Sequence, residues 1–205
     1  MNAQHPITRS TSRRVVANLA LTLDGSFHGA GGPDDLAPIV RYAVTDVARN
    51  HMARFISTAT TAVLGRVNAE GFLGFWPALI SSDGVDPRDE AYAKWLVATE
   101  KVVLSTTLTD APGENSRVRN APAAEVVAEL RDVGVGDILV NSSPSVIQEL
   151  LAADEVDRLE LLVVPELAGG GTRLFEAGLP ATRWTLARHE AGEQGELSLT
   201  YDRAR

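Results

Sequence analysis

Apolar strand-like segments alternate with helix-like segments along most of this 205-residue chain, and the alternation leaves few folds open. Strands are predicted at residues 14–23, 61–65, 101–105, 137–141 and 158–164. Two further β segments, 184–190 and 196–202, flank a glycine-containing turn and predict a hairpin. The pattern therefore predicts one α/β domain over residues 13–205, with a central, mostly parallel sheet, an antiparallel C-terminal hairpin and helices on both faces.

Helical spacing is clearest after the first strand. Val40, Val44, Val47, His51 and Phe55 recur on one face and predict a single helix of about four to five turns. Position 46 lies nearly opposite this stripe, so its aspartate is expected to face water. The histidine of the stripe is expected to be a hydrogen-bonded core side chain. Further helices are predicted at 88–100, from 122 to a stop at 134, and from a hydroxyl cap at 143.

Charge and composition exclude several classes of protein. The net charge of −8 disfavours electrostatic binding of nucleic acid over a broad surface. The absence of cysteine excludes a disulfide scaffold and a thiolate metal site, and with four scattered histidines no metal centre is expected. No apolar run reaches bilayer length, so neither a membrane partner nor secretion is expected and the cytoplasm is the expected location. Residues 1–12 are polar and predict a flexible lead-in.

Potential phosphate ligands follow three of the predicted strands. Gly65 and Arg66 follow one strand, and the hydroxyls of residues 105–107 follow the next. A glycine amide, a guanidinium and several hydroxyls could together hold a phosphate monoester, although ordinary strand exits with capping hydroxyls would look the same. The segment 141–145 opens a helix, whose free amides could receive a diphosphate or could simply be capped.

Four other motifs have both a functional and a structural interpretation. Asp24, in an Asp-Gly pair at the end of the first strand, could exchange protons or could shape a turn. Asp34 and Asp35 could exchange protons or start a helix. The glycines at 169–171 could permit close approach of a ligand or a chain reversal. The aromatic side chains at 72, 75 and 76 could line a flat heteroaromatic ligand or fill the core.

An ordered series of segments carries a family resemblance: LTLDG at 21–25, VLGRVNAEGFLGFWP at 63–77, KVVLSTTL at 101–108, GDILVNSSPSVIQELL at 136–151 and VDRLELLVVPELAGGGTRLF at 156–175. The chain resembles the dihydrofolate-reductase-like family, and more closely the stand-alone relatives of the C-terminal reductase domain of riboflavin biosynthesis. The resemblance implies a mostly parallel sheet, NADPH across its carboxyl edge, a small-molecule substrate and a homodimer.

The resemblance also assigns roles to residues. It places Asp24 beside substrate and nicotinamide as a proton partner. It places Gly65 and Arg66, with Ser105 and Thr106, at the adenosine 2′-phosphate and the adjoining phosphate. Together with the strand-end residues and the aromatic cluster described above, the predicted site residues form two sets. Cofactor binding falls to Leu64, Gly65, Arg66, Ser105, Thr106, Thr107, Asn141, Ser142, Ser143, Ser145 and Val146, and substrate binding to Asn18, Asp35, Phe72 and Trp76.

One departure from the family pattern concerns cofactor binding. Ser142 and Ser143 stand where the family usually has a glycine pair or Gly-Ser. A Cβ at this point narrows the space for a diphosphate or requires a different backbone angle.

Three functions therefore stay open. The first is an NADPH-dependent reductase that passes a hydride to a C=N or C=O bond of a small, heteroaromatic metabolite. The second is a non-catalytic small-molecule-binding protein that has lost NADPH, and the third is binding of a flavin.

Overall fold

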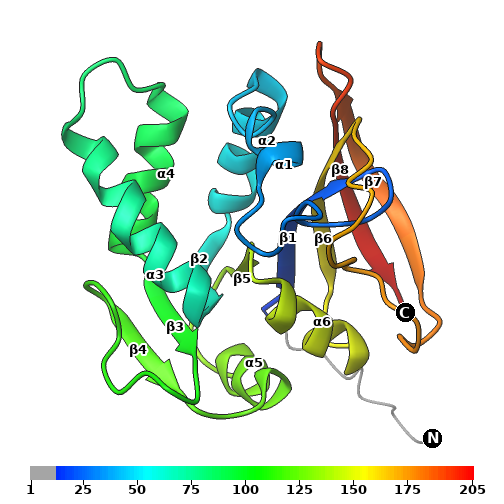
Figure 1. The fold of residues 1–205 in the computed structure, drawn as a ribbon. Helices are drawn as coiled ribbons and strands as arrows, with labels where there is room; N and C mark the ends of the chain where they lie inside the picture. Colours follow the sequence, from blue (N-terminus) through cyan, green and yellow to red (C-terminus); the bar gives the residue numbers. More distant parts are fainter. Residues whose placement is uncertain (1–12) are drawn as a thin grey trace, which may run out of the picture.

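Eight strands form one sheet in the computed structural model, which describes residues 13–205 (Figure 1). The predicted lead-in at 1–12 lies outside the described residues. The strand order is β4-β3-β2-β5-β1-β6-β8-β7, and every neighbouring pair from β4 to β6 is parallel, whereas β8 is antiparallel to β6 and to β7. The strands are β1 (Val15–Thr22), β2 (Ala59–Gly65), β3 (Glu100–Leu104), β4 (Ser116–Arg119), β5 (Asp137–Asn141), β6 (Arg158–Val164), β7 (Arg183–Ala191) and β8 (Leu197–Ala204).

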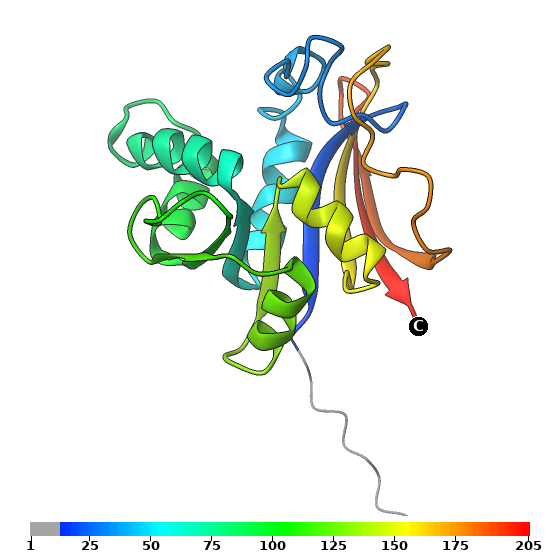
Figure 2. The same ribbon diagram turned by 60° about the horizontal axis from the view of Figure 1, so that its bottom comes forward.

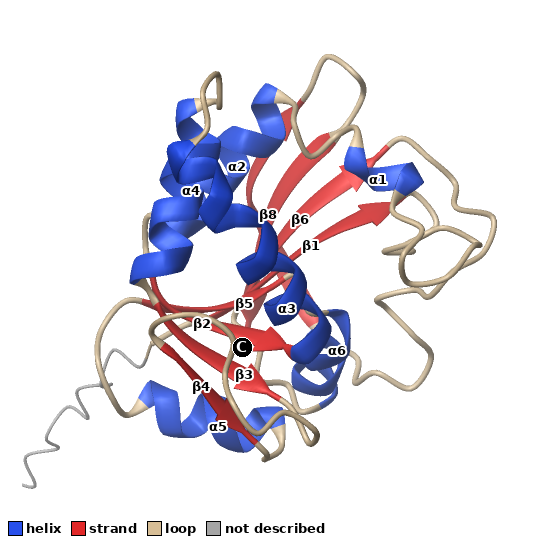
Figure 3. Ribbon diagram, turned by 60° about the vertical axis from the view of Figure 1, so that its left-hand side comes forward, coloured by secondary structure: helices blue, strands red, loops and turns tan. Residues whose placement is uncertain are grey.

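Helices cover both faces of this sheet (Figure 3). Figure 2 shows α5 and α6 on one side of β5 and β1, with α2 on the other side. The helices are α1 (Ala37–Val40), α2 (Asp46–Ile56), α3 (Arg66–Phe75), α4 (Pro87–Ala98), α5 (Ala123–Arg131) and α6 (Pro144–Ala152), with a 3₁₀ segment η1 (Trp76–Ser81). The predicted fold class, including the C-terminal hairpin, is confirmed.

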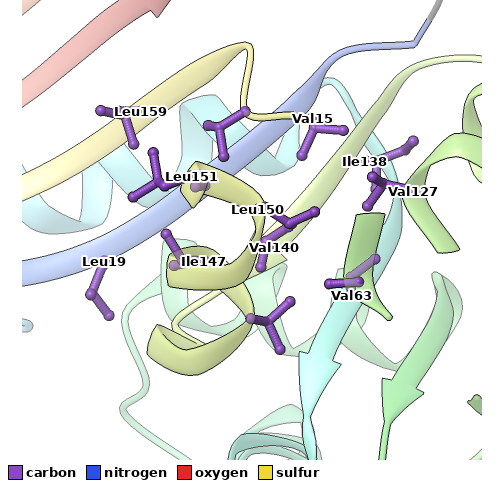
Figure 4. Packing of buried hydrophobic residues seen from close by; sticks show 14 of the residues in the cluster. Val15, Leu19, Val63, Val127, Ile138, Val140, Ile147, Leu150, Leu151 and Leu159 are labelled. Carbon is purple, nitrogen blue, oxygen red and sulfur yellow. The ribbon is translucent and has the colours of Figure 1, made fainter. Parts of the chain in front are cut away.

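The alternation of side chains along β1 divides the core between the two faces. Val15 and Leu19 point toward α6, where they meet Ile147, Leu150 and Leu151 (Figure 4). Val16, on the opposite face, packs with residues of α2 and α4. Burial of each such side chain stabilises the fold by roughly 1.5–3 kcal/mol, which holds the strand ends in place at the carboxyl edge.

The single helix predicted through Val40 and Phe55 is wrong, because the chain breaks it into α1 and α2. Thr45 has an extended backbone, and its hydroxyl accepts a hydrogen bond from the Ala48 amide at 3.3 Å, so it caps a new helix. Val44 is consequently 56% exposed instead of buried. The strand β4 was not predicted, because its four residues lie at a sheet edge and lack a strong apolar alternation.

The two predictions made for side chains of α2 have different outcomes. The Asp46 side chain is 82% exposed, as expected. His51 is buried, but neither of its ring nitrogens has a hydrogen-bond partner among residues 13–205, so the prediction of a hydrogen-bonded side chain is wrong. Burial and the nearby Arg54 lower the pKa of His51 to about 4, which keeps the ring neutral at pH 7.

Candidate functional site

A hollow of about 500 Å³ lies at the carboxyl ends of β2 and β3, beside the start of α6. It brings together eight of the residues predicted to bind a cofactor, although they are far apart in the sequence. These are Gly65, Arg66, Ser105, Thr106, Thr107, Ser143, Ser145 and Val146. Parallel strands place their carboxyl ends at one edge, which is where ligands of open α/β sheets bind.

Three other predicted cofactor residues do not line this hollow. Leu64 is fully buried and packs with Ala69 and Val103 in the core, so its side chain is not available to a ligand there. Asn141 is buried, and its side chain is hydrogen-bonded to other side chains of the protein. Ser142 turns the chain between β5 and α6, and its amide donates to the Asn18 carbonyl at 2.9 Å.

Ser142 and Ser143, which stand where the family usually has glycines, are accommodated in different ways. Ser142 keeps a left-handed backbone, with φ of 46°, which an L-residue adopts at a cost of about 1–2 kcal/mol. Ser143 is buried, and its hydroxyl accepts from the Gly65 amide at 2.9 Å and donates to the Asn141 carbonyl at 3.0 Å. The Ser143 hydroxyl thus uses a backbone amide that would otherwise face the hollow.

The start of α6 still presents donors to the hollow. Pro144, in the first turn, has no N–H to offer. The amides of Ser145 and Val146, also in the first turn, have no partner within the helix. These two amides, the Ser145 hydroxyl and the positive end of the helix dipole favour an anion at this point.

Arg66 provides a positive charge at the rim. It is the first residue of α3, and its Nη1 lies 3.0 Å from Glu70 Oε2, one turn further along. The side chain is 46% exposed, so it lies neither in the core nor fully in solvent. An exposed pair of this spacing is worth only about 0.3–0.5 kcal/mol, and a phosphate dianion would readily replace the carboxylate.

The hydroxyls that follow β3 are partly used by their own turn. Ser105 Oγ accepts from the amides of Thr107 and Leu108 at 3.1 and 3.0 Å. Thr106 is exposed at the rim. The hollow is also lined by Arg119, Asn120 and Glu149, which the sequence analysis missed. Arg119 belongs to the unpredicted edge strand β4 and is held by Glu129, so no sequence pattern pointed to it.

Asp24 lies in a different corner of the same edge, where β1 ends. Its Oδ1 accepts from the Thr22 hydroxyl at 2.5 Å and from the Ala168 amide at 3.1 Å. The Thr22 hydrogen bond, followed by that of Ala168, lowers the pKa of Asp24 below its usual value. At neutral pH the group is therefore a carboxylate, which can accept a hydrogen bond or a proton but does not begin as a proton donor.

The glycine cluster forms the wall of this second corner. Together with Asp24 and Arg173, Gly169 to Gly171 border a more open hollow of about 810 Å³. A Cβ on Gly171, whose φ is 84°, would lie 2.3 Å from the His28 carbonyl oxygen. The close approach that requires glycine here is therefore to the chain's own backbone.

His28 joins the two loops of this corner. Its Nε2 accepts from the Thr172 amide at 3.2 Å, and its Nδ1 lies 2.8 Å from the Gly29 carbonyl. An acceptor Nε2 requires the proton on Nδ1, which then donates to Gly29. The loop after β1 and the loop after β6 are thereby held together.

The predicted substrate residues Asn18 and Asp35 are occupied by internal hydrogen bonds. Asn18 Nδ2 donates to Asn141 Oδ1 at 3.0 Å, and Asn141 Nδ2 donates to the Tyr92 hydroxyl. Asp35 accepts from the Gly31 amide at 3.0 Å and closes the loop before α1. Neither residue lines the two hollows described above.

The predicted aromatic residues pack mainly against the core. The ring centroids of Trp76 and Tyr92 are 4.3 Å apart in an edge-to-face arrangement, and Phe72 packs on the same cluster. Phe75, in contrast, is 58% exposed. Phe72 and Trp76 do not line either hollow, so the structure supports core packing more than contact with a ligand.

Comparison with known proteins identifies the family. Residues 13–197 match the model of the RibD C-terminal domain. The chain belongs to the RibD C-terminal domain family. No curated protein sequence gives a match. Membership of this family and a fold shared with reductases support a reductase-type function for this chain.

Solved structures share the fold of this RibD C-terminal domain at low sequence identity. A Shewanella sp. PV-4 protein named for riboflavin biosynthesis has a TM-score of 0.68 and 21% identity, with 94% of this chain and 99% of that chain covered. Enterococcus faecalis dihydrofolate reductase, complexed with NADP(H), has a TM-score of 0.54 and 19% identity, with 94% and 97% covered.

A third neighbour is longer than this chain. It is the diaminohydroxyphosphoribosylaminopyrimidine deaminase/5-amino-6-(5-phosphoribosylamino)uracil reductase of Thermotoga maritima, with a TM-score of 0.63 and 12% identity. The match covers 94% of the RibD C-terminal domain chain described here and 57% of the Thermotoga chain.

In residues 13–205, no helix has both the length and the apolar character needed to cross a membrane.

Proposed function

We propose that this protein is an NADPH-dependent reductase that passes a hydride to a C=N or C=O bond of a small heteroaromatic metabolite. The observation that carries the proposal is the hollow between β2, β3 and α6. Arg66 of α3 and Ser145 and Val146 of α6 line this hollow. A cation with nearby hydroxyls and helix-start amides suits a phosphorylated dinucleotide. NADPH, when bound, supplies the hydride, and the protein positions it against the substrate.

Each part of the hollow has a proposed role in binding. The amides of Ser145 and Val146 would hold the diphosphate, because they point from the positive end of α6. Arg66, with Thr106 and the Ser105 turn, would hold the adenosine 2′-phosphate. Gly65 leaves room beside them, since a Cβ built on it would meet nothing closer than Val146 Cγ2 at 3.6 Å.

The corner around Asp24 is the proposed substrate side. Its carboxylate, with the pKa lowered by Thr22 and Ala168, would accept a hydrogen bond from a ring N–H and so orient the substrate. Because the group is ionised at neutral pH, the proton that completes the reduction would come from solvent or from another donor. Among the lining residues, Phe175 offers an apolar ring surface to a flat ligand.

One observation favours the alternative of a binding protein that does not use NADPH. The buried Ser143 hydroxyl accepts the Gly65 N–H, so a phosphate would have to do without this donor. A charge-assisted hydrogen bond of this kind contributes about 1.5–3 kcal/mol, so its loss would weaken the cofactor site substantially. In that case the hollow would hold another small molecule without turnover.

Isothermal titration with NADPH, NADH and flavin mononucleotide tests the proposal. We expect NADPH to bind best, and Arg66→Gln to weaken NADPH about tenfold while changing NADH little. Arg117→Gln is the matched control, because Arg117 is also half-exposed and paired with a glutamate but lies outside the hollow. Failure of all three ligands to bind at about millimolar concentration would leave the non-catalytic binding protein as the better description.

The homodimer implied by the family resemblance and the cytoplasmic location expected from the composition stay predictions. A mass near twice 21.9 kDa in light scattering would support the dimer.

A further inference from the structure

A third cavity, of about 230 Å³, lies away from the proposed reductase site, under the C-terminal end of α2. Its lining includes Arg158, the first residue of β6, so it lies toward the end of the sheet opposite the carboxyl edge. Three arginines, Arg54, Arg158 and Arg188, share this cavity with the polar side chains of Glu160 and Thr200. None of these residues takes part in the function proposed above.

Strand register explains why these polar side chains meet. Glu160 on β6 lies opposite Thr200 on β8, and Thr200 lies opposite Arg188 on β7. Residues directly opposite each other in neighbouring strands share a face of the sheet, so all three face α2. A polar row thus crosses three strands in a region that helices otherwise cover.

A β-bulge turns Arg188 toward this row. The register of β7 against β8 shifts between Leu186 and Arg188, so Ala187 is the extra residue. In a regular ladder, Ala187 would stand opposite Thr200, and Arg188 would lie opposite Leu199 on the other face of the sheet. Bulges often re-aim a side chain next to a binding site, and this one brings a guanidinium to the cavity.

Two of the arginines keep donor capacity for a guest. Arg158 uses Nε and Nη2 to bind Asp202 at 2.7 and 3.0 Å, and its Nη1 lies 4.0 Å from Glu160 Oε1, too far for a hydrogen bond. Arg188 Nη2 lies 3.9 Å from Glu190. Arg54 is more fully used, because it binds both Glu190 and Ser198.

Glu160 provides the acceptor of the cavity. It is buried, and its Oε2 accepts from the Thr200 hydroxyl at 2.6 Å. Behind it, the buried His51 has its Nδ1 3.6 Å from the same oxygen and makes no hydrogen bond within residues 13–205. Glu160 Oε1 lies 4.0 Å from Arg158 Nη1, beyond hydrogen-bond distance, so a guest that donates a hydrogen bond to Oε1 would fit this wall.

The lining of the cavity carries one more basic than acidic side chain. Its lining carries three guanidinium groups against the carboxylates of Glu160 and Asp137. Asp137 is already bound by Arg14, at 2.9 and 2.8 Å, and by Thr58 at 2.7 Å. A volume of about 230 Å³ equals roughly seven or eight waters at about 30 Å³ each, which is enough for a small organic acid.

We propose that this cavity binds a small hydroxy acid, whose carboxylate accepts hydrogen bonds from Arg158 and Arg188 and whose hydroxyl donates to Glu160. The ligand would bind between α2 and the hairpin, away from the proposed cofactor site. It would therefore be a second ligand, with its own determinants.

Titration of the full chain with L-malate at constant ionic strength, followed by calorimetry, tests the proposal. We expect saturable binding that weakens at least about fivefold in Arg188→Gln. Arg183→Gln is the matched control, because Arg183 lies on the same strand, is exposed and is outside the cavity. It should change the affinity less than about twofold. Since the Arg188 side chain is 57% exposed, its replacement should leave the melting temperature and NADPH binding unchanged.

Two probes test the chemistry of the guest. Succinate lacks the hydroxyl of malate and should bind several-fold more weakly, because it cannot donate a hydrogen bond to Glu160. Equal binding of succinate and malate would overturn the role of Glu160. Absence of saturable malate binding at about 50 mM, equal weakening by both arginine variants, or binding of inorganic phosphate in place of malate would overturn the proposal.

Discussion

Glycines at two corners of the carboxyl edge have different surroundings. At the exits of β2 and β3, Gly65 and the start of α6 border the hollow of about 500 Å³. At the exits of β1 and β6, Gly171 packs against the His28 backbone, and Asp24 accepts a hydrogen bond from the Ala168 amide. A Cβ on Gly65 would meet nothing closer than 3.6 Å, whereas one on Gly171 would come within 2.3 Å of a backbone oxygen.

The difference shows that a glycine motif at a strand end does not by itself identify a ligand site. What distinguishes the corners is whether the amides and oxygens around the glycine already have partners. At Gly171 the surrounding loops are joined by His28 and Thr172, so the glycine serves packing. At Gly65 one donor is used by Ser143, while the α6 amides remain. The same substitution should therefore have different effects at the two corners.

The largest effect is expected from Gly171→Ala. The new Cβ would collide with the His28 carbonyl, and φ of 84° disfavours any L-residue, so we expect a loss of about 3 kcal/mol in the free energy of unfolding. Urea denaturation measures this loss. Gly169→Ala is the control, because it shares a positive φ of 64° but meets nothing within 4 Å and should lose only about 1 kcal/mol. Equal losses would show that the loops can move apart.

Gly65→Ala should affect binding instead of folding. Its φ of −74° suits alanine and its surroundings have room, so the free energy of unfolding should change by less than about 0.5 kcal/mol. The methyl group would hinder the approach of a phosphate, and we expect NADPH affinity to fall about tenfold. Calorimetry and denaturation together check both parts. A variant that unfolds easily but binds normally would reverse the assignment of the two corners.

The two serines before α6 should respond in opposite directions to glycine. Ser142→Gly relieves the left-handed strain at φ of 46° and should stabilise the protein by about 0.5–1 kcal/mol. Ser143→Gly removes a buried hydroxyl with two hydrogen bonds and should destabilise it by about 1–2 kcal/mol. Urea midpoints of both variants give the comparison. Destabilisation by Ser142→Gly would mean that its hydroxyl has a role the backbone angle does not explain.

The smallest effect concerns Asp24 and acid. Because its folded-state pKa is lowered, the carboxylate contributes stability above its unfolded pKa of about 3.9, and this is lost as pH falls through the folded value. Asp24→Asn should therefore remove part of the decrease in stability below about pH 4 and leave the pH profile above about 5 unchanged. Urea midpoints between pH 2.5 and about 7 measure this. An unchanged acid profile would show that the Thr22 and Ala168 hydrogen bonds do not favour the ionised form.

Most of the sheet follows from local sequence pattern. The central strands are continuous apolar runs, and Pro144 after a hydroxyl residue marks the start of α6, so both could be predicted. The break between α1 and α2 could not, because the apolar spacing continues through Val44 and only the geometry of the Thr45 cap shows that a new helix begins. The edge strand β4 has too few apolar residues to be recognised, and Arg119 was missed with it.

The candidate site shows the same limit at the level of single atoms. The residue types that follow β2, β3 and β5 pointed to a phosphate site, because parallel strands bring their ends together whatever the details of packing. Which donors remain free could not be read from those residues. Ser143 binds Gly65 across 78 positions of sequence, Asn141 binds Asn18 across 123, and Gly171 packs on the distant His28 loop. Hydrogen bonds between distant segments depend on distances of a few tenths of an ångström, and only the packed fold determines these distances.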